Sequence, residues 1–508
     1  MQRRRGTDVL VWTALVLLLV ALRMHEAAAR TLWGDELFSL ALARRGWIDL
    51  LRGAVQNVVH PPLFYVVLRL WISIGGEHPL WLRSLPVLFS VLSLIPTALL
   101  WRELALPRRA FRVTLLLIAC SGFLVRYGQE LRMYSLLQLL SLTSLYLFLR
   151  FLRAARTSMP EVAVMVMVNV AMVYTHYYGW IVLACQGLFL LLARRSRLGA
   201  FVAGLLPVAI AFLPWLWLVT YRTAAIGGLE SNLAGLSRPG WVDLIEYFSG
   251  LLGPSPHFVR AGLLPGLVIA FAPLLLAVAV VSRRGPPDAE DRFAVGFLSL
   301  FAYVPVGAVM AASHVLPQPI FQPRYLIITA VPFLLLCGAL LDRVRQRMLR
   351  TTLLALVAGW SILGAAEPFL APDRVAWGDL VHRMLTRCPR PEPSSGKVPI
   401  YVLGPGNRRP ILYYLKREMA EDGFEIRLVR DVSKIPPGDG WVASRAVARD
   451  RSAARRIRYW GGAALSEVES SLLERGFRIG CVFESGRPPE EGYILSIRPS
   501  ASPRKTTD

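Results

Sequence analysis

The sequence predicts a polytopic α-helical membrane protein with a small C-terminal α/β domain. Of its 508 residues, 55% are hydrophobic, and the mean hydropathy is +0.47. Runs of about 20 apolar residues recur over the first two thirds of the chain, and this is the length that crosses a bilayer. After Glu367 the composition becomes polar, and short β-like runs alternate with helical ones, which is typical of an α/β domain.

The charge and the cysteines narrow the class further. The formal net charge is +23, as expected for basic loops beside membrane helices. Nearly all the basic residues are arginine, a bias that a GC-rich genome also produces, so we infer no nucleic-acid partner. The five cysteines form no Cys-x-x-Cys pair, and only Cys388 and Cys481 share the polar tail, where they could form a disulfide.

The first apolar run sets the orientation. Arg3–Arg5 precede Val9–Leu22, and Ala27–Ala29 would suit signal-peptide cleavage, but the later membrane runs favour an uncleaved first helix. The positive-inside rule then places Arg3–Arg5 in the cytoplasm and the residues after the first helix outside.

The segment Pro61–Gly75 decides the rest of the topology. It is short, opens with two prolines and contains Arg69, so we predict that it lies on the outer membrane surface without crossing. Eleven crossings then follow, with every basic loop inside and a long outer loop at Tyr221–Arg260. The crossings after the first are expected near Leu85–Trp101, Val113–Val125, Leu136–Phe151, Glu161–Val173, a run ending before Arg194, Gly199–Thr220, Leu263–Val281, Phe293–Ala312, Leu326–Leu341 and Thr352–Ala366.

These boundaries predict three parts. Residues 1–366 form a transmembrane domain, residues 367–499 an extracytoplasmic α/β domain, and residues 500–508 a disordered tail. In the α/β domain we expect two helices, Arg409–Met419 and Ser466–Arg475. Strands are expected at Val398–Leu403, Phe424–Val429, Trp441–Ala443, Ile479–Phe483 and Tyr493–Ile497.

Polar and ionisable residues gather on the predicted outer face, where they are costly and therefore candidates for function. Arginines there are informative because the orientation rule depletes them, although an arginine can also snorkel to lipid phosphates. Tyrosines at this depth can be interfacial anchors, and two acids can simply favour a helix start. The residues of these clusters are Asp35, Glu36, His60, Arg83, Arg126, Glu130, Arg132, Tyr134, His176, Tyr178, Arg324 and Tyr325.

Together these residue types suit one reaction. A carboxylate such as Asp35 can take a proton from an acceptor hydroxyl. The planar forks of Arg132 and Arg324 can bind phosphate oxygens bidentately and neutralise a leaving group. A sugar phosphate on a lipid tail would present its phosphate at this depth. The acids and histidines could also bind a divalent metal, but their spacing matches no fixed ligand pattern.

Five short motifs follow one another over about Met1–Leu341. They are Trp33–Glu36, His60–Tyr65, Arg83–Pro86, Glu130–Tyr134 and Arg324–Tyr325. This order resembles the C-type (GT-C) membrane glycosyltransferases, in particular bacterial relatives of the protein O-mannosyltransferases and the aminoarabinose lipid A transferases. The resemblance implies an inverting transfer of a sugar from a polyprenyl-phosphate donor to a lipid, glycan or protein acceptor. It also implies a bacterial inner membrane with the active site outside.

The resemblance also implies roles for individual residues. Asp35 would be the general base, and Glu36 would orient the base or the acceptor. The donor phosphate would contact Arg132, Arg324 and His60, to which we add Arg83 and Arg126. The pocket would be lined by Tyr65, Glu130, Tyr134, His176, Tyr178 and Tyr325.

One position departs from the resemblance. The aminoarabinose transferases have an acid before the His60 position, where this chain has Val59, so a metal ligand is missing there. We therefore predict no obligatory metal, with a divalent metal left open.

Two other functions remain open from the sequence. A transporter or flippase of a lipid-linked substrate would also gather arginines in a lateral cavity, but the chain shows no internal repeat. A non-catalytic membrane scaffold with a partner-binding tail would carry the same helices.

Overall fold

In the computed structural model, the chain divides into two compact units. The helical unit comprises Met1–Ala27, Ser39–Leu233 and Arg238–Leu370, and the α/β unit comprises Ala28–Phe38, Ala234–Ser237 and Ala371–Asp508. The structure describes all residues except 1, 26, 28–31, 155–157, 227–237, 255–263, 282–288, 371–374, 389–396, 404–406, 430, 438, 448–464, 488–489 and 500–508. The predicted disordered tail therefore lies outside the described residues.

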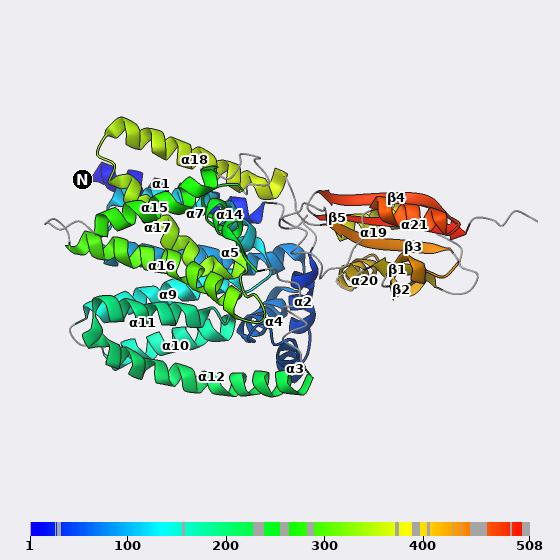
Figure 1. Ribbon diagram of the computed structural model, residues 1–508, viewed down its shortest axis with the longest axis horizontal. Helices are drawn as coiled ribbons and strands as arrows, with labels where there is room; N and C mark the ends of the chain where they lie inside the picture. The colour runs from blue at the N-terminus through cyan, green and yellow to red at the C-terminus, as the bar shows by residue number, and fades with distance from the viewer. Residues whose placement is uncertain are drawn as a thin grey trace, which may run out of the picture. The chain divides into compact units, whose positions relative to one another are not determined.

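The helical unit is an assembly of apolar helices whose leucine- and phenylalanine-rich faces pack against one another (Figure 1). One further helix, α2 (Gly34–Ala43), starts among residues of the α/β unit and ends in the helical unit. The others are α1 (Gln2–Met24), α3 (Trp47–Asn57), α4 (Leu63–Gly75), α5 (Pro79–Leu92), α6 (Leu94–Glu103), α7 (Arg108–Cys120), α8 (Gly122–Gln129), α9 (Tyr134–Arg153), α10 (Met159–Thr175), α11 (Gly179–Ala193), α12 (Leu198–Ile226), α14 (Trp241–Leu252), α15 (Leu264–Val281), α16 (Ala289–Val315), α17 (Ile327–Asp342) and α18 (Arg347–Leu370).

Many of these helices are long and apolar enough to cross a membrane. Over the described residues there are seven such spans, or eight if the bent pair α7–α8 counts as one. The predicted first, fifth and sixth crossings correspond to α1, α10 and α11, whose apolar stretches are shorter. The multi-span fold is confirmed, and the count of eleven crossings stays a prediction.

Helix α4 has the short length expected for Pro61–Gly75. Its 13 residues rise about 20 Å, well short of the roughly 30 Å of a hydrocarbon core. Its position at the membrane surface remains a prediction.

The predicted single helix Val113–Val125 is wrong, because α7 and α8 meet at an angle of 55°. Ser121 between them is extended, and its side chain accepts a hydrogen bond from the N–H of Leu124, which starts α8. The buried guanidinium of Arg23 accounts for the other side of the break, since it donates to the carbonyls of Ile118 and Ala119 at the end of α7.

The predicted outer loop Tyr221–Arg260 also needs correction, because it contains helix α14. Tyr247 and Phe248 of this helix are buried, and the hydroxyl of Tyr247 donates to the carbonyl of Leu326, 2.7 Å away. The apolar positions of α14 recur at helical spacing, so the segment folds against α17 rather than crossing solvent as an open loop.

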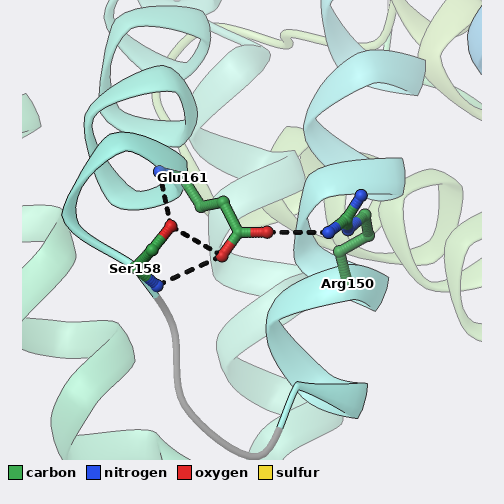
Figure 2. Close-up of polar contacts among 3 residues, drawn as sticks. All are labelled: Arg150, Ser158 and Glu161. Atoms are coloured by element: carbon green, nitrogen blue, oxygen red, sulfur yellow. Dashed lines mark hydrogen bonds and ion pairs between the residues drawn. The ribbon is translucent and has the colours of Figure 1, made fainter.

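Helix α10 begins with a capping box (Figure 2). The Ser158 hydroxyl accepts from the N–H of Glu161, and the Glu161 carboxylate accepts from the N–H of Ser158. The same carboxylate accepts a hydrogen bond from Arg150 of α9 at 2.7 Å, so one acid fixes the helix start and pairs with its neighbour.

The α/β unit contains a five-stranded sheet in the order β2-β1-β3-β5-β4. Strands β1 (Val398–Leu403), β2 (Phe424–Val429) and β3 (Gly440–Val447) are parallel, and β4 (Phe477–Arg487) and β5 (Glu490–Pro499) pair antiparallel at the other side. The register joins Val398 to Phe424 in β1–β2 and Ile400 to Trp441 in β1–β3.

Three helices cover this sheet in two layers. Helices α19 (Trp377–Arg387) and α20 (Arg408–Arg417) share a buried cluster with one face of the sheet, and α21 (Leu465–Glu474) shares a second cluster with the other face. All five predicted strands and both predicted helices are present, whereas α19 was not predicted. The Cys388–Cys481 disulfide left open by the sequence is formed.

Candidate functional site

The two adjacent acids lie in the first turn of helix α2. Glu36 is 1% exposed, and its carboxylate accepts a hydrogen bond from the N–H of Trp33 at 3.1 Å. This contact satisfies one of the donors that a helix start leaves over. Asp35 is partly exposed, so of the two acids Glu36 has the visible structural role.

Arg132 lies in the tight connection between α8 and α9. Its guanidinium is buried, and Nη1 donates to the Oγ of Ser39 at 3.1 Å. Helix α8 ends at Gln129, Glu130 is extended and buried, and the N–H of Arg132 donates to the Glu130 carbonyl at 2.6 Å. Ser39 was not among the predicted site residues; the signal that points to it is its position one helical turn after Asp35.

His60, His176, Tyr178 and Tyr325 form a compact group, which we call the histidine–tyrosine cluster. The ring centroids of His60 and His176 are 4.9 Å apart, and those of His176 and Tyr325 are 4.5 Å apart. Tyr178 completes the group at 5.1 Å from His176 and 5.5 Å from Tyr325. The sequence therefore identified four side chains that the fold brings together from three separate segments.

Local structure explains how these side chains are presented. Helix α3 ends at Asn57 with Val58 in the left-handed region (φ 50°), and His60 follows immediately before α4. His176 is the extended residue after α10, and α11 starts only three residues later. The hydroxyl of Tyr178 donates to the carbonyl of Ile320, which joins this turn to the segment before α17.

Arg324 and Tyr325 stand at the start of α17. They lie in a short 3₁₀ turn, Pro323–Leu326, and the guanidinium carbon of Arg324 is 5.4 Å from the centre of the Tyr325 ring. The span that begins with this turn is the most enclosed of the described spans, with 83% of its apolar window buried. The two side chains are therefore fixed to the best-packed part of the helical unit.

Positive charge surrounds the two histidines. Burial, together with the guanidinium groups of Arg132 and Arg324, lowers the pKa of His176 to about 3. The same causes, with a contribution from His176, lower the pKa of His60 well below its usual value. Both rings are therefore neutral at physiological pH, and the net charge around them comes from the arginines.

Hydrogen bonding fixes the tautomer of His176. Its Nδ1 accepts from the N–H of Tyr178 at 3.1 Å, so in the neutral ring the proton is on Nε2. Nε2 of His176 and both ring nitrogens of His60 are buried and have no hydrogen-bond partner among the described residues.

The other predicted site residues lie around this group in different ways. Tyr134 is buried and its ring is 6.1 Å from that of Tyr325. Arg83 is buried in α5 and donates to the carbonyl of Ala27 at 2.9 Å. Tyr65 is buried in α4, where its ring contacts Phe64, and Arg126 is partly exposed in the last turn of α8.

Among the described residues, no three His, Cys, Asp or Glu side chains gather in a way that could hold a metal ion. The predicted independence from metal stays a prediction.

Searches with protein-family models and against curated protein sequences give no match. Solved structures do match. ArnT from Cupriavidus metallidurans in the apo state is 14% identical with a TM-score of 0.55, and the match covers 97% of this chain and 98% of ArnT. ArnT bound to undecaprenyl phosphate gives a TM-score of 0.54, with the same identity and coverage.

A third match is the oligosaccharyltransferase of Archaeoglobus fulgidus tethered to an acceptor peptide. It is 15% identical with a TM-score of 0.50, and the match covers 82% of this chain and 63% of that protein. These structures are C-type membrane glycosyltransferases, and at such identities the likeness concerns the fold. The chain is therefore a multi-pass membrane protein with the C-type glycosyltransferase fold of ArnT.

Proposed function

We propose that the chain is an inverting glycosyltransferase that moves a sugar from a polyprenyl-phosphate donor to an acceptor hydroxyl on the extracytoplasmic face of the membrane. The observation that carries the proposal is the pair Arg132 and Arg324 beside two buried neutral histidines, in a chain with the fold of ArnT. One of the matching ArnT structures has undecaprenyl phosphate bound, which supports a lipid phosphate as the donor's anionic group.

Guanidinium groups at this depth suit a leaving phosphate. They remain charged at any physiological pH, and in a buried setting their hydrogen bonds to phosphate oxygens are strong. His60 and the tyrosines Tyr134 and Tyr325 would contact the same phosphate and the sugar, because they pack in the same region.

Asp35 is the proposed base. Helix α2 carries Asp35 in its first turn and Ser39 one turn later, and Ser39 accepts the hydrogen bond of Arg132. The base would therefore be covalently tied, through one helical turn, to a partner of a phosphate-binding arginine. Glu36 holds the N–H of Trp33 and thereby fixes the start of the helix that carries the base.

The reaction then balances as follows. The acceptor O–H gives its proton to the Asp35 carboxylate as its oxygen bonds to the anomeric carbon of the sugar. The bond from that carbon to the phosphate oxygen breaks on the opposite face, and the electron pair leaves with the polyprenyl phosphate. Arginines stabilise the charge that develops on this phosphate, which is the main task of such a site.

The test begins with the substrate. Mass spectrometry of envelope glycolipids and glycans, with and without the protein, identifies the sugar, and the purified protein in proteoliposomes is then assayed with the matching polyprenyl-phosphate sugar. Asp35→Asn should lower transfer at least about 100-fold, the usual contribution of a general base. Asp49→Asn is the matched control, because Asp49 is an exposed acid of α3 paired with Arg52.

Transfer by Asp35→Asn at the wild-type rate would remove the proposed base. Exchange of labelled lipid across the membrane without sugar release would favour a flippase instead.

A further inference from the structure

We propose that His176 donates a hydrogen bond from Nε2–H to an oxygen of the donor phosphate, and that the His60–His176 pair is an anion site rather than a metal site. The proposal deepens the glycosyltransferase function above and rests on it. It assigns a direct phosphate contact to His176, which the sequence indicated only as a pocket-lining residue.

The tautomer of His176 carries the first step. A neutral imidazole has one N–H and one lone pair. The lone pair of His176 is on Nδ1, where it accepts the N–H of Tyr178 at 3.1 Å, so Nε2 has only a proton to offer. Because this nitrogen is buried without a partner among the described residues, an incoming oxygen would satisfy it.

The same tautomer is wrong for a metal. Coordination through Nε2 would need the lone pair on Nε2 and the proton on Nδ1, where it would meet the N–H of Tyr178. His60 offers only one further imidazole, and no third ligand of the His, Cys, Asp or Glu type gathers with the pair among the described residues. The residues present therefore do not fit a metal ion.

The surrounding charge favours an anion over a cation. Arg132 and Arg324 both act on the two rings and oppose even a single positive charge there, as the low pKa of each histidine reflects. A divalent cation between the rings would meet twice that opposition, whereas a phosphate would be attracted by the same two groups.

The cluster also holds the donor nitrogen in place. The ring of His176 packs between those of His60 and Tyr325, with Tyr178 at its edge. A rigid neutral donor needs little reorganisation when charge develops on the leaving phosphate. His176 would thus strengthen its contact as the sugar–phosphate bond breaks, without giving up its proton.

The experiment measures binding of undecaprenyl phosphate to the full-length protein in detergent micelles, by isothermal titration, separately from sugar transfer. His176→Phe keeps an aromatic ring in the cluster and removes the donor, so affinity should fall about tenfold or more, as for a hydrogen bond to a charged group. His176→Gln places an amide N–H near the position of Nε2 and should recover most of that loss. His78→Gln, at an exposed histidine before α5, should bind like the wild type.

Metal is tested on the same samples. Treatment with a chelator should leave undecaprenyl phosphate affinity unchanged, and zinc chloride should give no stoichiometric binding that depends on His176. Thermal unfolding of each variant verifies that the fold is retained.

Each outcome is decisive. If the wild type transfers sugar but His176→Phe binds undecaprenyl phosphate as tightly as the wild type, or if zinc binds at one equivalent and is lost in His176→Phe, the inference is wrong while the glycosyltransferase function stands. If the wild type neither binds undecaprenyl phosphate nor transfers sugar, the proposed function and this inference fall together.

Discussion

The guanidinium of Arg132 and the hydroxyl of Ser39 lie 3.1 Å apart, with Nη1 as the donor. This hydrogen bond joins the turn after α8 to the helix whose first turn carries Asp35. It is the described contact through which a predicted phosphate-binding residue is held by a side chain near the predicted base. Its removal should therefore affect catalysis through position.

Ser39→Ala should raise the KM for the polyprenyl-phosphate sugar about 5- to 20-fold, because Arg132 loses a buried acceptor that fixes its fork. Ser39→Thr retains the hydroxyl and should recover most of the affinity. Ser299→Ala is the control, since its hydroxyl donates only within α16 to Val295. Equal KM values for Ser39→Ala and the wild type would contradict the positioning role.

Gly122→Ala should destabilise the helical unit by about 1–3 kcal/mol, as overpacking does in a close-packed core. An added Cβ at Gly122 would overlap the backbone oxygen of Gly364 in α18, which neither residue can relieve by a rotamer change. Gly307→Ala in α16 is the matched control, because its Cβ would meet nothing within 4 Å. Thermal unfolding in detergent compares the two, and an equal effect would show that α8 and α18 are not in this close contact.

Acid should destabilise the protein through its buried histidines. The pKa of His176 is about 3 in the folded chain and about 6.5 when unfolded, so only the unfolded chain gains a proton between these values and stability falls as the pH drops below 6.5. At pH 5 the loss from His176 is about 2 kcal/mol relative to neutral pH, and His60 acts in the same direction.

The measurement is the unfolding temperature at pH 7.5 and at pH 5. His176→Phe should lose less stability over this range than the wild type. An identical decrease in both proteins would indicate that the ring is not kept neutral by the fold.

The Cys388–Cys481 disulfide should contribute about 2–5 kcal/mol to the stability of the α/β unit, because it closes a loop with a sequence separation of 93. A reductant should make the wild type more susceptible to proteolysis in this unit and leave the Cys388→Ser/Cys481→Ser double variant unchanged. Such a disulfide also belongs in an oxidising compartment, as the predicted topology requires. Free thiols at both positions in protein purified from membranes would argue against that topology.

Hydropathy and strand patterns predicted most of the elements. The strands at Val398–Leu403 and Phe424–Val429 have the predicted bounds, because β-branched runs between turn residues leave few alternatives. Helix α19 was missed although Trp377, Leu380, Val381 and Met384 recur at helical spacing, because this short run follows the last apolar helix directly. The break at Ser121 could not be predicted, since it depends on Arg23 and Gly364, which lie far away in the sequence.

The candidate site was predictable in its members and not in its contacts. Ionisable residues at the ends of apolar runs pointed to His60, Arg132, His176 and Arg324. Which of them touch is set by how α3, α10 and α17 pack, and this long-range information is absent from a motif. The tautomer of His176 depends on a single backbone N–H and is visible only in the fold.

The segment Ala28–Phe38, which includes Asp35, clusters with the C-terminal α/β unit and not with the membrane helices. Tyr414 of α20 explains the attachment, since its phenol oxygen accepts the N–H of Leu32 at 2.6 Å, and Arg409 lies over the ring of Phe38 at 5.2 Å. The soluble tail thus acts as a clamp on the strip of chain that bears the presumptive nucleophile-activating acid. Amputating the tail should silence the enzyme even if no acceptor ever docks there.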